Sequence, residues 1–500
     1  SDIFPALAQA LAKSDLQARM QPLGVGKAMR PQYTRAYLDE MREAALILLY
    51  RLLFLFYAED RGLLPVRDPR YRPYSARRLR EQVRDDLDAG LPQSSQQGKL
   101  WRNLQVVFSI IDEGDDSIGI PPYNGGLFDR ARSPLLERIK VPDAIFAPII
   151  DTLSRRAEDL LKGWINYRDL SVAHLGGIYE RLLEYTLEHE VAPKDSFENT
   201  PEINRIVARP ASFARKVSGS YYTHDDLVRL ILRESVGLLA RERTESFAMR
   251  IDRWKKKTAL NPADWDVLDK LDPASAILEL KICDPAMGSG HFLVALVDDL
   301  ADRVLEAINT AGHLVSEQPW AAHLIEQGRP WQSPLVARIA HIRRTIKGAA
   351  HEHGWAVTDA QLDDRHIVRR MILKKSVFGV DKNPMAVELA KTALWLHTFT
   401  VGAPLSFLDH HLKCGDSLHG ERLPDVARGI EALGMLFQRG ELARLEIAAK
   451  SLAQVADLTD VDIAEAKLSK QLADDAAQQV APIHVLLDFW RALRWKLPGW

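Results

Sequence analysis

The spacing of apolar residues predicts helices through the first part of the chain. Residues 40–65, "EMREAALILLYRLLFLFYAEDRGLLP", are apolar on every side of a helix and end in a Gly-Leu-Leu-Pro stop. Arg51 interrupts this run and Glu59–Asp60 close it, so the run is too short to span a membrane and predicts a buried helix. Residues 133–157 continue the helical pattern. Residues 173–190 predict an amphipathic helix, with Leu175, Tyr179, Leu182 and Leu183 on one side.

The pattern changes after Pro210. Residues 276–292 and 374–397 each read as a short β-type run, a polar turn and a helix, and residues 405–420 add the end of a third strand. This alternation is typical of a parallel α/β sheet. From about Glu421 the chain is rich in Ala and Leu with interleaved charges, which predicts a pair of helices.

We therefore expect three regions. Residues 1–205 form a mostly α-helical N-terminal domain, residues 206–420 form an α/β domain with a helical insert at about 298–375, and residues 421–500 form a further helical insertion. Composition is that of an ordinary globular protein, with 46% hydrophobic residues and a formal net charge of −2. Nucleic-acid binding would therefore depend on local basic patches, and the two cysteines fit a reducing cytoplasm.

The string "DPAMGSGHF", residues 284–292, carries the most specific chemistry. A dinucleotide turn needs three glycines in G-x-G-x-x-G spacing, whereas this turn has Gly288 and Gly290 followed by bulky Phe292. Asp284 precedes the glycines, and a carboxylate there repels phosphate and attracts a cation. S-adenosylmethionine carries an ammonium and a sulfonium and no phosphate, so it suits the turn better. A structural turn capped by Asp284 is the alternative.

Two further acids follow the ends of predicted strands. Asp381 is suited to accept hydrogen bonds from ribose hydroxyls, although it lies 97 residues after Asp284 where a minimal unit has about 20. Asp416 in "KCGDSLHG" can accept from an adenine amine, with Leu418 near the ring. An ordinary capping role is the alternative for Asp381. A "GDSL" string alone also occurs in serine hydrolases, but nothing else in the chain supports that chemistry.

Together, "SGSYYTH", "DPAMGSGHF", "GVDKNP" and "GDSL" resemble the motifs of gamma-class DNA adenine-N6 methyltransferases, in the gamma order. "YNGGLFD" and "LGGIYERLLE" resemble the large methylases of type IIG restriction–modification, BREX and DISARM phage-defence systems. The resemblance implies a Rossmann-like S-adenosylmethionine-dependent methyltransferase sheet with helical insertions. It assigns cofactor binding to Tyr221, Tyr222, Thr223, Asp284, Pro285, Ala286, Gly288, Ser289, Gly290, His291, Phe292, Asp381, Lys382, Asn383, Asp416, Ser417 and Leu418.

Two departures from that family pattern stand out. His224 replaces the proline that usually follows the threonine of the first motif. The Asn-Pro-Pro-aromatic string that holds the target amine is absent, since Asn261-Pro262 and Asn383-Pro384 lie in other contexts. The catalytic residues are therefore unknown, and we expect this chain to be the N-terminal part of a longer polypeptide.

Double-stranded DNA is the expected partner, with further subunits of a defence system beside it. The predicted contacts are Arg67, Arg70 and Arg72 in a stretch with interleaved tyrosines, and Arg343 and Arg344 in the insert. A plain solvated surface is the alternative for both groups. No metal and no membrane are expected: His351, His353 and His366 lie in a charged segment, and Glu279-Leu280-Lys281 has the letters of a nuclease site but precedes the cofactor loop.

The function expected from the residues is site-specific transfer of a methyl group to a flipped adenine. The main alternative is a catalytically inactive subunit that binds cofactor and DNA, which the missing Asn-Pro-Pro string favours. Methylation of cytosine N4, of RNA or of protein glutamine also stays open. The recognition sequence, the presence of a fused nuclease, the type of defence system and the oligomeric state are not determined by this sequence.

Overall fold

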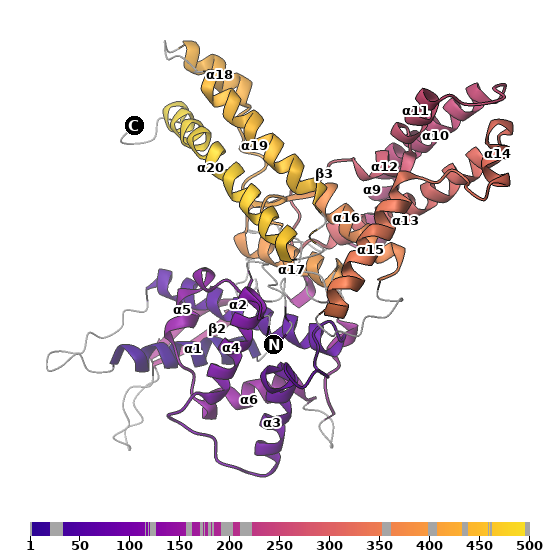
Figure 1. Ribbon diagram of the computed structural model, residues 1–500. Helices are drawn as coiled ribbons and strands as arrows, with labels where there is room; N and C mark the ends of the chain where they lie inside the picture. Colours follow the sequence, from indigo (N-terminus) through magenta and orange to yellow (C-terminus); the bar gives the residue numbers. More distant parts are fainter. Residues whose placement is uncertain are drawn as a thin grey trace, which may run out of the picture. The chain divides into compact units, whose positions relative to one another are not determined.

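The chain folds as two compact units (Figure 1). The computed structural model of the protein describes residues 3–20, 34–115, 117–118, 120, 127–156, 163–170, 174, 176–178, 182, 185–191, 204–210, 223–352, 362–398, 408–432, 439–458, 460 and 463–495. The first unit contains Ser1–Thr223 with Trp395–Val401, and the second contains His224–Leu394 with Gly402–Trp500. The domain boundary expected near residue 205 lies within the first unit.

The first unit is mostly helical. Its helices are α1 (Ile3–Met20), α2 (Arg35–Asp60), α3 (Ala76–Asp88), α4 (Lys99–Glu113), α5 (Pro134–Arg138) and α6 (Asp143–Ser154), with short 3₁₀ turns η1 (Arg72–Tyr74), η2 (Arg130–Arg132) and η3 (Tyr167–Asp169). The predicted helix at residues 40–65 is confirmed as α2, and every residue from Ala44 to Glu59 is buried. In the described part of the chain, no helix combines the length and the apolar character needed to cross a bilayer.

Arg51 shows how this buried helix accommodates a charge. Its Nε donates to the carbonyl oxygen of Leu127 at 2.8 Å and its Nη2 to that of Asp129 at 3.0 Å. The guanidinium also lies over the rings of Phe108 and Phe128. Burial lowers the pKa of Arg51 to about 10, against the opposing effect of nearby acids. The residue that interrupts the apolar run therefore ties α2 to a distant loop.

The predicted helix at residues 173–190 is wrong at its C-terminal end. β1 (Tyr185–Val191) pairs antiparallel with β2 (Asn204–Pro210), with Leu187 opposite Ala208 and His189 opposite Ile206. Leu187 and Ile206 are buried while Glu188 is exposed, which is the two-residue alternation of a strand. The "TLEHEV" letters carry that alternation, and the longer helical pattern before them conceals it. Of the four residues expected on one face, only Leu182 is among those described.

The second unit contains a three-stranded parallel sheet of order β3-β4-β5. β3 (Ile282–Asp284), β4 (Val377–Asp381) and β5 (Leu412–Cys414) pair with Asp284 opposite Gly379 and Asp381 opposite Cys414. Helix α13 (His291–Ser316) follows β3 and α17 (Pro384–Thr398) follows β4. The expectation of an α/β domain with parallel strands is confirmed. These three strands do not by themselves define the complete Rossmann-like sheet.

One predicted β-type run is instead a helix. Residues 273–278 form α12 (Pro273–Leu278), and β3 begins only at Ile282. Asp272 is the N-cap of α12, and its Oδ2 accepts from the backbone N–H of Ser275 at 2.9 Å. Asp-Pro at a helix start is a recognised signal, because proline at the first position lacks the N–H that would otherwise be unpaired. The apolar residues after Pro273 were predicted to begin a strand because the Asp272-Pro273 helix-start signal was not taken into account.

The remaining helices of the second unit form two groups. The first group is α9 (Asp225–Glu234), α10 (Val236–Trp254), α11 (Pro262–Lys270), α14 (Ala322–Glu326), α15 (Pro334–Glu352) and α16 (Asp364–Lys375). Of these, α14, α15 and α16 lie with most of α13 in the range 298–375, where helices were expected, whereas α9, α10 and α11 precede it. The second group is α18 (Leu423–Ala432), α19 (Arg439–Asp457) and α20 (Ile463–Arg494). The predicted helical pair is confirmed as α19 and α20, which pack along each other as a hairpin.

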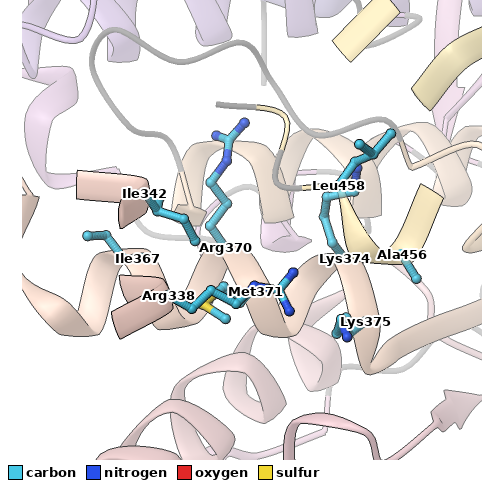
Figure 2. A pocket seen from close by; sticks show the side chains of 9 residues that line it. All are labelled: Arg338, Ile342, Ile367, Arg370, Met371, Lys374, Lys375, Ala456 and Leu458. Atoms are coloured by element: carbon cyan, nitrogen blue, oxygen red, sulfur yellow. The ribbon is translucent and has the colours of Figure 1, made fainter. Parts of the chain in front are cut away.

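A buried ion pair fixes the turn of this hairpin to α16. Lys374 Nζ lies 2.6 Å from Asp460 Oδ2, and the two side chains are 2% and 0% exposed. Asp460 adopts a left-handed φ of 49°, and Ser469 Oγ accepts from Lys374 Nζ at 3.0 Å. The small pocket in Figure 2 lies at this junction, between α15, α16 and the end of α19. Separating the two side chains would leave a buried charge without its counter-ion, which is strongly unfavourable. The pair therefore fixes the position of the hairpin turn relative to the end of α16, which leads into β4.

Candidate cofactor site

The turn after β3 is held by its own backbone and by β4. Asp284 Oδ1 accepts from the backbone N–H of Ala286 at 3.0 Å, and Met287 N–H donates to the carbonyl oxygen of Val380 at 3.0 Å. Met287 is buried, while Pro285 and Ala286 are exposed. The turn is therefore anchored to β4 through Met287, while Pro285 and Ala286 remain open to solvent.

The two glycines of the turn have different constraints. Gly288 and Gly290 both have left-handed φ values, 54° and 82°, a region that side chains rarely occupy. A Cβ on Gly290 would lie 2.9 Å from the Cα and the Cβ of Ala390 on α17, whereas a Cβ on Gly288 would meet no atom within 4 Å. Gly290 thus allows close packing of a helix, and Gly288 faces open space. Ser289 and Phe292 are half-buried beside them.

Asp381 connects the end of β4 to the glycine turn. Its Oδ2 accepts from the backbone N–H of Gly288 at 2.9 Å, and its Oδ1 accepts from that of Asn383 at 2.8 Å. Asn383 Oδ1 accepts from the N–H of Met385 at 3.0 Å and so begins α17. A carboxylate has about four acceptor positions. Each oxygen of the half-buried Asp381 therefore keeps capacity for one further donor.

Asp416 lies just beyond β5 at the same edge of the sheet. Its Oδ1 accepts from the N–H of Leu418 at 3.1 Å, and its Oδ2 lies 3.2 Å from His419 Nδ1 and 3.3 Å from Lys382 Nζ. The hydrogen bond from His419 lowers the pKa of Asp416 to about 2, with the Leu418 N–H contributing. Asp416 is therefore an ionised acceptor, and an adenine amine there would share or replace these partners. Leu418 is 89% exposed and Ser417 is exposed beside it.

Helix α9 contacts the first residue of α13 through an aspartate–histidine pair. His291, the first residue of α13, places Nε2 3.0 Å from Oδ1 of Asp225, the first residue of α9. Burial lowers the pKa of His291, against the opposing effect of Asp225. His224 caps α9, with its Nδ1 accepting from Asp226 N–H at 3.3 Å, and Thr223 is half-buried just before it. The predicted residues Tyr221 and Tyr222 lie outside the described residues.

Three carboxylates lie at the carboxyl edge of this sheet: Asp284, Asp381 and Asp416. Burial raises the pKa of Asp284, and the negative charge of Asp381 raises it further against the hydrogen bond from Ala286. The edge therefore favours a ligand that bears positive charge and disfavours phosphate groups. In the described residues, no cluster of His, Cys, Asp and Glu is arranged to hold a metal ion.

The arginines predicted to contact DNA in the first unit differ in their partners. Arg70 is bound to Asp68, with Nη2 2.6 Å from Oδ2, and the guanidinium in turn lowers the pKa of Asp68. Arg67 and Arg72 are exposed. Arg70 is therefore occupied by its neighbour.

The two predicted arginines in the second unit divide in the same way. Arg343 forms an ion pair with Asp364, and its Nε donates to the carbonyl oxygen of Leu362 at 2.9 Å. Arg344 is exposed, and its Nε donates to the carbonyl oxygen of Ala340 in its own helix at 3.4 Å. Arg343 thus fixes the start of α16, and Arg344 stays available to solvent.

Some residues of the site were not predicted from the sequence. Ala390 sets the approach of α17 to Gly290, Asp225 pairs with His291, and His419 pairs with Asp416. His419 could have been anticipated, because it lies three residues after Asp416 in the same turn. The other two pairings join elements that are distant in sequence, and no local pattern indicates them.

Comparison with known proteins finds similarity to a curated protein and to a solved structure. The chain is 23% identical over 414 residues to a protein of Methanocaldococcus jannaschii named "Putative type II restriction enzyme and methyltransferase RM.MjaORFECS2P". The aligned region covers 76% of this chain and 28% of that protein. A solved structure of the type IIL restriction-modification enzyme MmeI in complex with DNA matches with a TM-score of 0.38 and 14% identity, over 96% of this chain and 48% of that one. No protein-family model matches the chain. The chain is thus similar in sequence to a protein named as a restriction enzyme and methyltransferase, and it spans less than a third of that protein's length.

Proposed function

We propose that this chain is the S-adenosylmethionine-binding part of a site-specific DNA adenine-N6 methyltransferase of a restriction–modification or phage-defence system. The observation that carries the proposal is the meeting of Gly288 and Asp381 at the edge of a parallel sheet. That edge combines an open glycine turn with acceptors for hydroxyl groups and with negative charge. The likeness to a curated relative named as a restriction enzyme and methyltransferase supports the same conclusion.

The residues present fit the cofactor. The two free acceptor positions of Asp381 suit the two neighbouring hydroxyls of a ribose, and the open space at Gly288 accommodates a ligand against the backbone. Asp284 supplies negative charge for an ammonium or sulfonium group, and Asp416 with Leu418 suits an adenine ring. When bound, the cofactor supplies an electrophilic methyl group on sulfur. The strands β3, β4 and β5 would correspond to the first, second and third strands of a doubly wound fold. In that fold the fourth strand lies on the other side of the first, so a complete Rossmann-like sheet would continue beyond β3.

A pyrophosphate-bearing dinucleotide fits this edge poorly. Its phosphates would approach the N-terminal end of α13 from beside Asp284 and Asp381, where the charge of Asp381 already raises the pKa of Asp284. The site thus discriminates by charge as well as by the spacing of its glycines.

Methyl transfer needs acceptors for the protons of the target amine and a surface for the flipped base. In the family that the sequence resembles, an Asn-Pro-Pro-aromatic string provides them, and this string is absent from the 500 residues. We therefore propose cofactor binding for this chain by itself. Methyl transfer is proposed for the polypeptide that contains both this chain and such a string, where the contribution of the protein is mostly orientation.

Calorimetric titration of the chain with S-adenosylmethionine tests the cofactor site. We expect one binding site per chain, competition by S-adenosylhomocysteine, and no heat with NAD⁺ at the same concentration. Preference for NAD⁺ or ATP would overturn the proposal. Incubation of the chain, and of a polypeptide that carries it together with an Asn-Pro-Pro-aromatic string, with labelled cofactor and plasmid DNA, followed by nucleoside analysis, then distinguishes methyladenine from N4-methylcytosine.

A second candidate function is a subunit that binds cofactor and DNA without chemistry. The absent Asn-Pro-Pro string favours it. Tight cofactor binding with no labelled nucleoside from the longest natural form of the protein would select this function. Labelled RNA or protein glutamine in the same assay would instead identify a different acceptor.

A further inference from the structure

The C-terminal end of α10 carries a dense run of positive charge. The eight residues Arg250–Lys257, "RIDRWKKK", contain five basic side chains and one acid, Asp252. The structure separates the basic residues that are already paired from those that are not.

Two of the five basic side chains are occupied. Lys257 Nζ lies 2.7 Å from Asp264 and 4.8 Å from the ring centre of Trp254. The guanidinium of Arg250 lies 6.0 Å from the same ring. These two residues therefore cover the tryptophan and belong to the structure of the helix end.

The other three, Arg253, Lys255 and Lys256, are exposed and form no ion pair with any described residue. A single cation near the C-terminal end of a helix is explained by the helix dipole. The dipole stabilises such a charge by about 0.3–1 kcal/mol, and only within the last turn. Three adjacent unpaired cations exceed that need, and their mutual repulsion is unfavourable. An anionic partner would remove the repulsion.

The helix end is held rigidly. Phe247, Ile251 and Trp254 pack with Leu268, Ala311, Val315, Trp320 and Ala321 in one buried cluster. Trp331 stacks on Phe247 with ring centres 5.9 Å apart, and its Nε1 donates to Asp269 at 2.9 Å. In Figure 1, α10, α11 and α14 lie together at one end of the second unit, away from β3. The backbone at the end of α10, from which the three cations extend, is therefore anchored by this buried cluster.

The position of this end suits the dimensions of a DNA duplex. Helix α13 begins at the cofactor turn with His291, and its residues Ala311 and Val315 pack in the cluster beneath Trp254. At about 1.5 Å per residue, His291 and Val315 are about 36 Å apart. One turn of B-DNA is about 34–36 Å. A duplex with its target base near the cofactor turn could thus present its backbone to this helix end about one turn away.

We propose that Arg253, Lys255 and Lys256 bind phosphates of double-stranded DNA. This interaction rests on the proposed function, since it assigns a DNA contact to the same second unit that holds the cofactor site. The proposed partners are phosphates, which are the same at every base pair, so the contact is electrostatic and independent of base sequence.

The test compares two variants that remove one arginine and two lysines each. R253Q/K255Q/K256Q removes the proposed contact. R444Q/K467Q/K470Q removes the same charge from exposed positions on α19 and α20. Fluorescence anisotropy with a labelled duplex, over a series of salt concentrations, gives the affinity and its salt dependence. Calorimetric titration with S-adenosylmethionine is made on the same preparations.

If the three residues each contact one phosphate, the slope of log K against log salt falls by about 2.7 in magnitude in the first variant. The control variant keeps the slope of the unmodified chain, and all three proteins keep their cofactor affinity. Equal slopes in the two variants, or an unmodified chain that fails to bind the duplex at low salt, would overturn the proposed contact. Loss of cofactor binding by the unmodified chain would instead overturn the proposed function, so the two failures are distinguishable.

Discussion

The backbone N–H of Gly288 donates a hydrogen bond to the carboxylate of Asp381 at 2.9 Å, across 93 residues of sequence. This contact joins the turn after β3 to the end of β4, and the N–H of Asn383 binds the other oxygen of the same carboxylate. The two chain segments that the cofactor would touch are therefore positioned by one side chain. Asp381 thus has a structural role in addition to its proposed binding role, and substitutions at the site can separate the two.

Asp381→Asn should weaken S-adenosylmethionine binding by about 10- to 100-fold. The amide is neutral and offers one acceptor oxygen in place of two, and hydrogen bonds to charged groups contribute about 1.5–3 kcal/mol. Calorimetric titration measures the affinity, and thermal unfolding reports whether the turn stays folded. Asp266→Asn is the matched control, because Asp266 is an exposed aspartate on α11. Equal affinity of D381N and the unmodified chain would exclude a direct role for this carboxylate.

Cofactor affinity should rise with pH through the pKa of Asp284. Burial and the charge of Asp381 raise that pKa above its ordinary value. A cationic ligand prefers the ionised carboxylate, so protonation at lower pH weakens binding and ionisation at higher pH restores it. S-adenosylhomocysteine lacks the sulfonium charge and should show a smaller change. Titrations across the acidic range measure both, and a similar pH dependence in Asp284→Asn would assign the effect to another group.

Gly290→Ala should reduce mainly the stability of the chain, whereas Gly288→Ala should reduce mainly its affinity for the cofactor. The first places a Cβ 2.9 Å from two atoms of Ala390 and should lower the melting temperature strongly. The second meets no atom and incurs mainly the cost of a left-handed φ, about 1–2 kcal/mol. Its methyl group points into the proposed cofactor space, so its loss of cofactor affinity should exceed its loss of stability. Differential scanning fluorimetry and calorimetry together give the two quantities.

Gly312→Ala provides the control for these glycine substitutions. Gly312 lies within α13 with an ordinary helical φ, and a Cβ added there would meet no atom within 4 Å. Alanine at this position should stabilise the chain by about 0.5–1 kcal/mol and leave cofactor affinity unchanged. A destabilised G312A would show that this face of α13 is covered by other side chains.

Lys374→Met should release the turn of the α19–α20 hairpin. Removing one partner of a buried ion pair costs about 3–5 kcal/mol, and the carboxylate of Asp460 that would lose the lysine is fully buried. Hydrogen exchange should become faster in amides of the hairpin turn and of the adjoining end of α16. Lys467→Met, an exposed substitution on α20, should change exchange little. Unchanged exchange in K374M would show that the pair does not hold the turn.

The local sequence was sufficient to predict an element where the pattern of one segment indicated a single structure. The strand-turn-helix at Val377–Thr398 and the burial of α2 follow from runs of apolar residues with clear stop signals. It was insufficient where two signals competed in a few residues. The apolar letters before β3 form helix α12, and the letters after residue 184 form strand β1. In both places a short signal, an Asp-Pro cap or a two-residue alternation, was outweighed by a longer pattern.

The sequence by itself determined that a glycine turn and two later aspartates would follow the ends of parallel strands, because these residues and their neighbours carry the signal locally. Only the tertiary structure decided which partners the side chains have: Asp381 with Gly288, His291 with Asp225, and Arg343 with Asp364. The same holds for the choice between occupied and free cations, on which the proposed DNA contact at Arg253, Lys255 and Lys256 depends. The physical reason is that hydrogen bonds and ion pairs act over a few ångströms in space, whereas these partners are separated along the chain by up to 93 residues.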